Sequence, residues 1–265
     1  MTHAGYLVNG PQPRTGTRSG FCTGIASMSP PEDEPSEVES RRMFDNLRKA
    51  IAYWLGGLAS QLVVLLVAAL AGLPLPLLPV HLLWISVLTN GLPALALVMD
   101  PIDDDAMRRP PHRPGEPLLG GREGTSIGLV AVLEAAVTIG VFVWALQDHS
   151  LANARDLAFS VLVFAELFRS VAARSTTRVF WQVGPLGNLM LVGVIAGSVL
   201  LHLVIHHVPW TKHVLELHAM SSTDWLLVFT VGLMPVTVLE LIKLTRALMA
   251  IAVRDQTMKR RSSGP

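Results

Sequence analysis

Long apolar stretches constrain this sequence more than any other feature. Six of them approach the roughly 20 residues that an α-helix needs to cross a bilayer. They span residues 51–72, 77–99, 126–146, 157–173, 186–205 and 226–244. Only 15% of the 265 residues are charged, against about 25% in a typical soluble domain. The sequence therefore predicts an all-α, polytopic membrane bundle with six transmembrane helices.

The positions of Lys and Arg predict the orientation of these helices, because cytoplasmic loops collect basic residues. Only Arg155 and Lys212 fall on one side of the predicted membrane. The other 19 of the 21 basic residues lie on the opposite side, in segments 1–50, 100–125, 169–185 and 243–265. We therefore expect both termini in the cytoplasm and a multi-pass protein of the plasma membrane.

The two ends of the sequence differ from the apolar middle, residues 41–250. Residues 1–40 are rich in Gly, Pro, Ser and Thr and contain no hydrophobic signal-peptide core. They are predicted to form a disordered cytoplasmic leader. Residues 251–265 are basic, and we expect them to form a solvated cytoplasmic tail near anionic lipid. The sequence thus divides into a leader, a membrane domain and a tail.

Composition also excludes several kinds of site. The single cysteine, Cys22, leaves no pair for an intrachain disulfide or a Cys-x-x-Cys metal site. No run of basic residues is interleaved with aromatic ones, and 21 Lys and Arg are nearly balanced by 20 Asp and Glu. The sequence therefore indicates no nucleic-acid partner, whereas membrane lipid is an expected one.

The second apolar stretch carries polar side chains at helical spacing. Ser86, Thr89 and Asn90 are spaced i, i+3, i+4, which places three oxygen-bearing side chains on one helix face. They directly precede Gly91-x-Pro93, which is able to unwind a helix and free backbone carbonyls for a cation. The alternative is that these residues only hydrogen-bond neighbouring helices.

The first apolar stretch has two polar positions, Ser60 and Gln61, beside the pair Gly56-Gly57. Small residues allow another helix to approach closely. Without further information, this pattern indicates helix packing.

Three carboxylates lie within other predicted spans. Glu134, Glu166 and Glu240 are candidates for a functional site, because a carboxylate in the membrane is costly to bury. Arg169 lies at i+3 from Glu166 and Lys243 at i+3 from Glu240, so structural ion pairs are the alternative. For Glu240, an interfacial pair with Lys243 is the preferred interpretation.

Histidines gather near the end of the fifth predicted span. His202 and His206 are spaced i, i+4, followed by His207, and such a set is able to hold zinc on a helix face. The preferred alternative is that they are solvated or face lipid at the interface.

Three segments together carry a resemblance to a known family. Residues 41–49 read Arg-Arg-Met-Phe-Asp-Asn-Leu-Arg-Lys, and residues 83–94 run from Leu-Trp-Ile to Thr-Asn-Gly-Leu-Pro-Ala. Residues 100–111 run from Asp-Pro to Met-Arg-Arg-Pro-Pro. This pattern resembles cation-transporting P-type ATPases of the calcium-pump kind. The likeness covers residues 38–250 and corresponds to the fifth to tenth transmembrane helices of that family.

The resemblance implies a cation site in mid-membrane, formed by the fourth, fifth, sixth and eighth helices. The family's asparagine and glutamate of the fifth helix fall on Leu58 and Gln61. The asparagine, threonine and aspartate of the sixth helix fall on Ser86, Thr89 and Asn90, and the glutamate of the eighth on Glu166. The candidate metal-binding positions are thus Glu166, Thr89, Asn90, Ser86 and Gln61.

Two carboxylates of the family pattern are amides in this sequence, at Gln61 and Asn90. Hard divalent cations are bound chiefly by carboxylate oxygens, so we expect weak calcium binding. A monovalent cation, a proton carried by Glu166, or no ion fits these residues better.

The family's motifs for phosphoryl transfer do not occur in this sequence. Asp-Lys-Thr-Gly, Gly-Asp-Gly-x-x-Asn-Asp and Thr-Gly-Glu are all missing. We therefore expect no catalytic residues, no cofactor and no ATPase activity on this chain alone, with ATP and Mg²⁺ bound only by a separate catalytic chain. Asp103 and Asp105 match acidic positions of the family's loop that contacts the phosphorylation domain, and the alternative is an ordinary acidic surface loop.

The preferred hypothesis is the membrane part of a truncated or split cation-transporting P-type ATPase. A non-catalytic accessory protein or a degenerate remnant without transport is the alternative, favoured by the two amides. An independent channel or secondary transporter is a third possibility.

Overall fold

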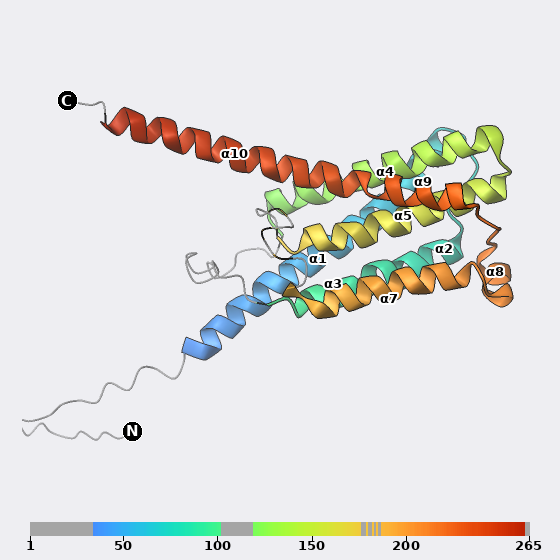
Figure 1. Ribbon diagram of the computed structural model, residues 1–265, viewed down its shortest axis with the longest axis horizontal. Helices are drawn as coiled ribbons and strands as arrows, with labels where there is room; N and C mark the ends of the chain where they lie inside the picture. Colours follow the sequence, from blue (N-terminus) through green and yellow to red (C-terminus); the bar gives the residue numbers. More distant parts are fainter. Residues whose placement is uncertain are drawn as a thin grey trace, which may run out of the picture.

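The computed structural model describes residues 34–101, 119–175, 179, 182, 184 and 187–262 (Figure 1). Every secondary-structure element in this part of the chain is helical, which confirms the predicted all-α class. The elements are α1 (Glu34–Leu70), α2 (Pro79–Trp84), the π-helix η1 (Ile85–Gly91), α3 (Leu92–Val98), α4 (Gly121–Asp148), α5 (Leu151–Ala173), α7 (Leu189–Ile205), α8 (Pro209–Leu215), α9 (Ser222–Gly232) and α10 (Met234–Ser262).

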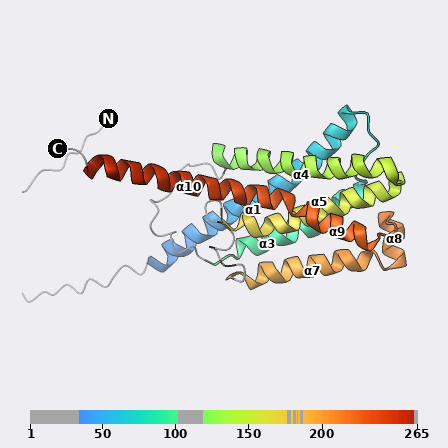
Figure 2. The same ribbon diagram turned by 45° about the horizontal axis from the view of Figure 1, so that its top comes forward.

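Most helices run along one axis, and α5 lies in the middle of the bundle (Figures 1 and 2). It packs against α1, η1, α4, α9 and α10. Sixteen of its 23 residues are buried, including Asp156, Glu166 and Arg169. Charged side chains are costly in lipid, so the helix that carries them is the one that the others surround.

Four helical segments are long and apolar enough to cross a membrane: Arg42–Leu70, Pro79–Val98, Glu123–Asp148 and Ser222–Ala250. The pair of α7 and α8, bent by 92°, is a fifth if the two form one broken span. Helix α5 corresponds to the expected span 157–173 and is 23 residues long, but four of these residues are charged. The described helices thus form a multi-pass membrane bundle with four or five apolar spans, and the sixth span stays a prediction.

Two helices extend beyond the expected boundaries. α1 begins at Glu34, so residues 34–40 are helical rather than part of a disordered leader. It continues to Leu70 because strong helix formers follow Pro35 without another proline. α10 runs through most of the expected tail, to Ser262. Both extensions lie at the same end of the bundle (Figure 1).

The segment up to Gly91-x-Pro93, where the sequence allows the helix to unwind, is a π-helical turn and not an unwound segment. Proline has no N–H, so it leaves a carbonyl of the preceding turn without its helical donor. The Thr89 carbonyl instead accepts a hydrogen bond from Tyr53 Oη of α1, at 2.8 Å. A donor from the neighbouring helix replaces the missing one, and the helix widens without breaking.

Apolar clusters hold α5 in place from both sides. One cluster joins Val64 of α1 and Ile85 of η1 to Phe159 on α5. Another joins Phe164 of α5 to Phe142 on α4, and Val228 of α9 belongs to the same cluster. The polar residues of the bundle therefore lie in a fixed, closely packed frame.

Candidate functional site

Polar side chains are buried together where α1, η1, α4 and α5 meet. Each of them is at most 5% exposed: Ser60, Gln61, Thr89, Asn90, Glu134, Thr138, Glu166, Arg169 and Ser170. Polar groups inside a membrane bundle are tolerated when they pair with one another or serve a function. We call this set the central polar cluster.

Three of the predicted site residues form a chain of contacts within or beside this cluster. Gln61 Nε2 donates to Glu166 Oε1 at 3.4 Å, and Ser86 Oγ donates to Gln61 Oε1 at 3.3 Å. Glu166 is fully buried, and its second oxygen, Oε2, has no hydrogen-bond partner among the described residues. Glu166 therefore has an oxygen available for a cation or a proton.

Asn90 is also fully buried and packs directly against Gly57 of α1. A Cβ atom at Gly57 would lie only 2.2 Å from Asn90 Oδ1, so any larger residue at this position would displace the Asn90 side chain. The Asn90 amide makes no hydrogen bond of ordinary geometry within the described chain, although it lies close enough to Glu166 to interact with it. The expected close approach at Gly56-Gly57 is thus present, and it makes room for a site residue.

Thr89 is buried but uses its hydroxyl within its own helix. Thr89 Oγ1 donates to the Ile85 carbonyl at 2.8 Å. The hydroxyl oxygen still has acceptor capacity, whereas its proton is directed away from the cluster. Ser86 is only half-buried. The three polar residues of the second span therefore differ in role, and Asn90 has the most unsatisfied polar atoms.

Arg169 forms an ion pair with Glu134 rather than with Glu166. Arg169 Nε lies 2.6 Å from Glu134 Oε1, and both side chains are buried. Arg169 Nη1 donates to the Tyr53 carbonyl at 3.1 Å, and the guanidinium lies 4.3 Å from the centre of the Tyr53 ring. Gly56 leaves space beside this guanidinium. The alternative of a Glu166–Arg169 pair at i, i+3 is therefore wrong, because α4 supplies the partner.

The charges of the cluster do not balance. It contains two carboxylates, Glu134 and Glu166, but one guanidinium, Arg169. The pair of Glu134 and Arg169 is neutral, so an ionised Glu166 would leave one uncompensated negative charge in the bundle. An isolated buried charge is very costly, and a cation or a proton relieves that cost. The cluster is therefore suited to hold one positive charge at Glu166.

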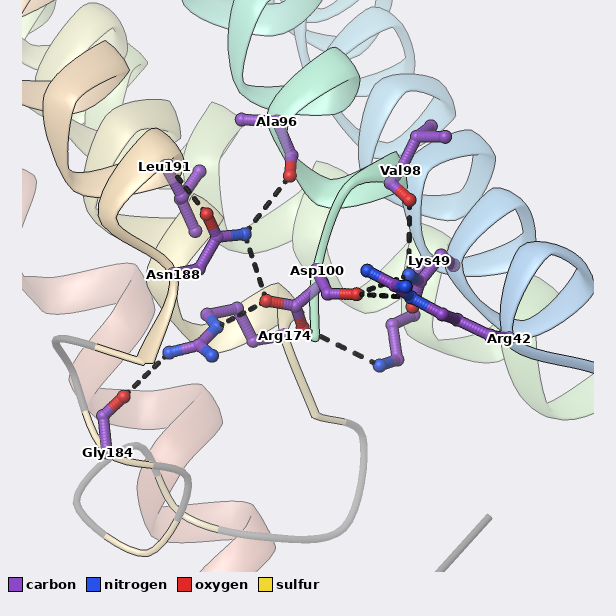
Figure 3. Close-up of polar contacts among 10 residues, drawn as sticks. Arg42, Lys49, Ala96, Val98, Asp100, Arg174, Gly184, Asn188 and Leu191 are labelled. Atoms are coloured by element: carbon purple, nitrogen blue, oxygen red, sulfur yellow. Dashed lines mark hydrogen bonds and ion pairs between the residues drawn. The ribbon is translucent and has the colours of Figure 1, made fainter. Parts of the chain in front are cut away.

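A second polar network lies at the end of the bundle where α1 begins (Figure 3). Asp100 Oδ1 accepts hydrogen bonds from Arg174 Nε and Asn188 Nδ2, both at 3.0 Å. Asp100 Oδ2 lies 3.8 Å from Lys49 Nζ. The Asp100 carbonyl accepts from Asn46 Nδ2 at 2.8 Å. This network connects α1 and the end of α3 to the end of α5, at Arg174, and to the start of α7, at Asn188. Sequence reasoning did not identify it.

The predicted coupling residues Asp103 and Asp105 lie outside the described residues. Both flanks of their loop are nevertheless anchored to α1. Asp100 holds one flank, and at the other Arg48 Nη2 lies 2.6 Å from Glu123 Oε1. Glu123 Oε2 also accepts from the Gly120 N–H at 2.9 Å. The loop therefore starts and ends against one helix.

The remaining candidates take separate positions. Lys243 Nζ lies 2.8 Å from Glu240 Oε1, which confirms the expected i, i+3 pair. His202 and His206 are buried and His207 is exposed, so only His207 agrees with the expectation of side chains that are solvated or face lipid. Within the described residues, no group of three or more His, Cys, Asp or Glu side chains is arranged to hold a metal.

Comparisons with known proteins agree with this architecture. The family described as "Cation transporting ATPase, C-terminus" matches residues 74–245. A "Calcium-transporting ATPase" of Bacillus subtilis (strain 168) is 36% identical over 210 residues, which are 78% of this chain and 24% of that protein. "Calcium-transporting ATPase 1" of Bacillus cereus is 31% identical over 251 residues, covering 87% of this chain and 28% of its own length.

A mouse relative is more distant. "Calcium-transporting ATPase type 2C member 2" of Mus musculus is 27% identical over 226 residues, covering 83% of this chain and 24% of its own length. The chain thus spans about a quarter of the length of these relatives. From the family match and these identities, the chain belongs to the cation-transporting ATPases and corresponds to their carboxy-terminal membrane region.

Proposed function

We propose that this chain is the membrane part of a cation-transporting P-type ATPase and that a separate catalytic chain supplies ATP hydrolysis, with its ATP and Mg²⁺. The observation that carries the proposal is the buried contact between Gln61 and Glu166, with Asn90 beside it, in a chain of this family. These residues come from α1, η1 and α5, which are held together by packing. Anchoring to α1 of the residues that flank the loop, Asp100 and Glu123, supports a route from a catalytic domain to the site.

The transported ion is a proton or a monovalent cation. The relatives are named as calcium transporters, but calcium sites use several carboxylates. In this cluster Glu134 is already paired with Arg169, which leaves Glu166 as the free carboxylate. Gln61 and Asn90 contribute neutral amide groups. One carboxylate with neutral ligands compensates one positive charge, so a divalent ion would leave an excess of charge.

We further propose six spans with both termini in the cytoplasm of a plasma-membrane protein. In this topology α5 is the sixth span, shielded from lipid by the helices around it. The start of α1 and the end of α10 lie at one end of the bundle, which supports an even number of crossings (Figure 1). Nineteen of the 21 basic residues fall on the same predicted side.

The test is purification of the tagged chain from native membranes, followed by mass spectrometry and ATPase assays with different cations. We expect a stoichiometric partner that carries an Asp-Lys-Thr-Gly motif, and turnover that a monovalent cation or protons stimulate. A chain that purifies alone and shows no cation-stimulated turnover would contradict the proposal.

A matched pair of variants tests the site itself. Glu166→Gln removes the free carboxylate, whereas Asp148→Asn removes an exposed one at the end of α4. We expect cation flux to be lost in the first variant and retained in the second. If Glu166→Gln leaves both flux and cellular phenotype unchanged, the chain is an accessory or degenerate membrane protein, the alternative that the amides at Gln61 and Asn90 favour.

A further inference from the structure

A buried histidine pair lies at the end of the bundle opposite the Asp100 network, close to α8 and α9. His202 belongs to the last turn of α7, and His206 follows the helix as its capping residue. His202 is fully buried and His206 is 6% exposed. Their ring centres are 5.3 Å apart. The i, i+4 spacing therefore brings two imidazoles together inside the protein, away from the central polar cluster.

Most of the nitrogens in this pair have no hydrogen-bond partner. His202 Nε2 lies 3.2 Å from Ser160 Oγ. His202 Nδ1 and both nitrogens of His206 form no hydrogen bond of ordinary geometry in the described chain. The backbone of His218 lies near His206, but it can serve only one of that ring's nitrogens. A buried polar atom left unsatisfied is costly, so several of them in one place point to a ligand.

We propose that His202 and His206 bind one cuprous ion. Imidazole nitrogens bind transition metals at about 2 Å, and two rings on one tetrahedral or trigonal ion then have centres about 5 Å apart. The observed ring separation meets this requirement without a change of helix geometry. His207 takes no part, because its ring is exposed and its Nδ1 lies 2.9 Å from the Leu203 carbonyl of its own helix.

The surroundings of the pair favour an ion of low charge. The rings of Phe164 and Trp225 pack edge-on against His202, at 5.5 and 6.2 Å between ring centres. Two neutral imidazoles in an aromatic shell do not compensate the two positive charges of a divalent ion. A monovalent ion brings only one positive charge into the same surroundings. The proposed site therefore differs from an ordinary zinc site in that its ion is monovalent.

A sulfur atom lies in the same neighbourhood. Ser160 Oγ, which contacts His202, also lies 3.8 Å from the sulfur of Met220. Thioether and imidazole ligands together select Cu⁺ among the first-row metals. Met220 is thus connected to His202 through Ser160, and its sulfur is a candidate for a third, weaker ligand.

The test uses the full chain in detergent micelles, titrated with Cu⁺ under ascorbate against the coloured chelator bicinchoninate. We expect one Cu⁺ per chain and a quenching of tryptophan fluorescence, because Trp225 lies 5.0 Å from the His206 ring. In His202→Asn and His206→Asn, we expect the affinity to fall by at least about tenfold. The matched control is His207→Asn, the exposed neighbour, which should keep the affinity of the unmodified chain.

Two further measurements keep the proposal falsifiable if a variant folds poorly. The copper X-ray absorption spectrum of the unmodified chain should show nitrogen ligands, and Cu⁺ should raise its Tm in proportion to occupancy. A spectrum without nitrogen ligands, an equal affinity in all four chains, or tighter binding of Zn²⁺ than of Cu⁺ would overturn the proposal. None of these measurements depends on ATPase activity, so they do not test the proposed transport function.

Discussion

Asp100 and Glu166 are both buried carboxylates, but their surroundings differ. Asp100 is held by Arg174, Asn188 and Lys49. Glu166 accepts one long hydrogen bond, at 3.4 Å from Gln61, and keeps one oxygen free of hydrogen bonds. A buried carboxylate whose charge is balanced by cations and hydrogen-bond donors stabilises the fold. One that lacks such partners lowers stability unless it binds a ligand or a proton. The comparison separates a structural network from a candidate site in one bundle.

The largest effect on stability is expected from Asp100→Ala. This change leaves Arg174 buried without its carboxylate and also removes one of the hydrogen-bond partners of Asn188. Breaking a buried ion pair by removing one partner costs about 3–5 kcal/mol. The free energy of unfolding in mixed detergent micelles measures the effect, with Asp148→Asn as the exposed control. A loss below about 1 kcal/mol would show that the Asp100 network is not structural.

Gly57→Ala should have the next largest effect. The added Cβ would lie 2.2 Å from Asn90 Oδ1, so Asn90 must move out of the cluster. Overpacking of this kind costs about 1–3 kcal/mol. Gly128→Ala on α4 is the matched control, because no atom lies within 4 Å of its Cβ position. Equal unfolding free energies of the two variants would contradict the close packing of α1 against η1.

Tyr53→Phe should cost less than either of these changes. It removes the hydroxyl that donates to the Thr89 carbonyl and also lies 3.1 Å from the Glu166 carbonyl, but keeps the ring beneath Arg169. Loss of one hydrogen bond to a buried carbonyl costs about 1–2 kcal/mol. The unfolding free energy measures this cost, and amide hydrogen exchange in residues 85–91 should increase. An unchanged exchange rate would show that Tyr53 does not stabilise the π-helix.

Glu166→Gln should change stability least, by less than about 1 kcal/mol, because this carboxylate has few partners to lose. Glutamine keeps the shape of the side chain and carries no charge. The comparison with Asp100 is sharpest here, since a small change in unfolding free energy should accompany a complete loss of cation flux. A destabilisation as large as that of Asp100→Ala would place Glu166 among the structural residues.

Several features of the fold and site could be predicted from residue patterns. The apolar stretches located every long helix of the described chain, since length and hydropathy are local properties. The polar spacing in the second span identified Asn90, and the rarity of carboxylates in membranes identified Glu134 and Glu166. The ion pair of Glu240 and Lys243 followed from their spacing on one helix. Each of these inferences uses residues near one another in the sequence.

The partners of these residues depend on contacts between helices. A pair of Arg169 with Glu166 within α5 was the alternative reading, but Glu134 of α4 forms the ion pair with this guanidinium. The sequence allows the helix to unwind at Gly91-x-Pro93, but Tyr53 of α1 supplies the missing donor. The role of Asp100 could not be inferred from its neighbours in the sequence, because its partners come from residues 42–49 and 174–188.

The sequence by itself determined the helical class, the approximate positions of the helices and the polar residues that need an explanation. Only the tertiary structure decided which carboxylate is compensated and which is free. The length and hydropathy of a segment are properties of consecutive residues. Compensation of a buried charge instead depends on atoms within about 4 Å, whatever their sequence separation. The packing of α4 and α5 therefore assigns Arg169 to Glu134 and leaves Glu166 available.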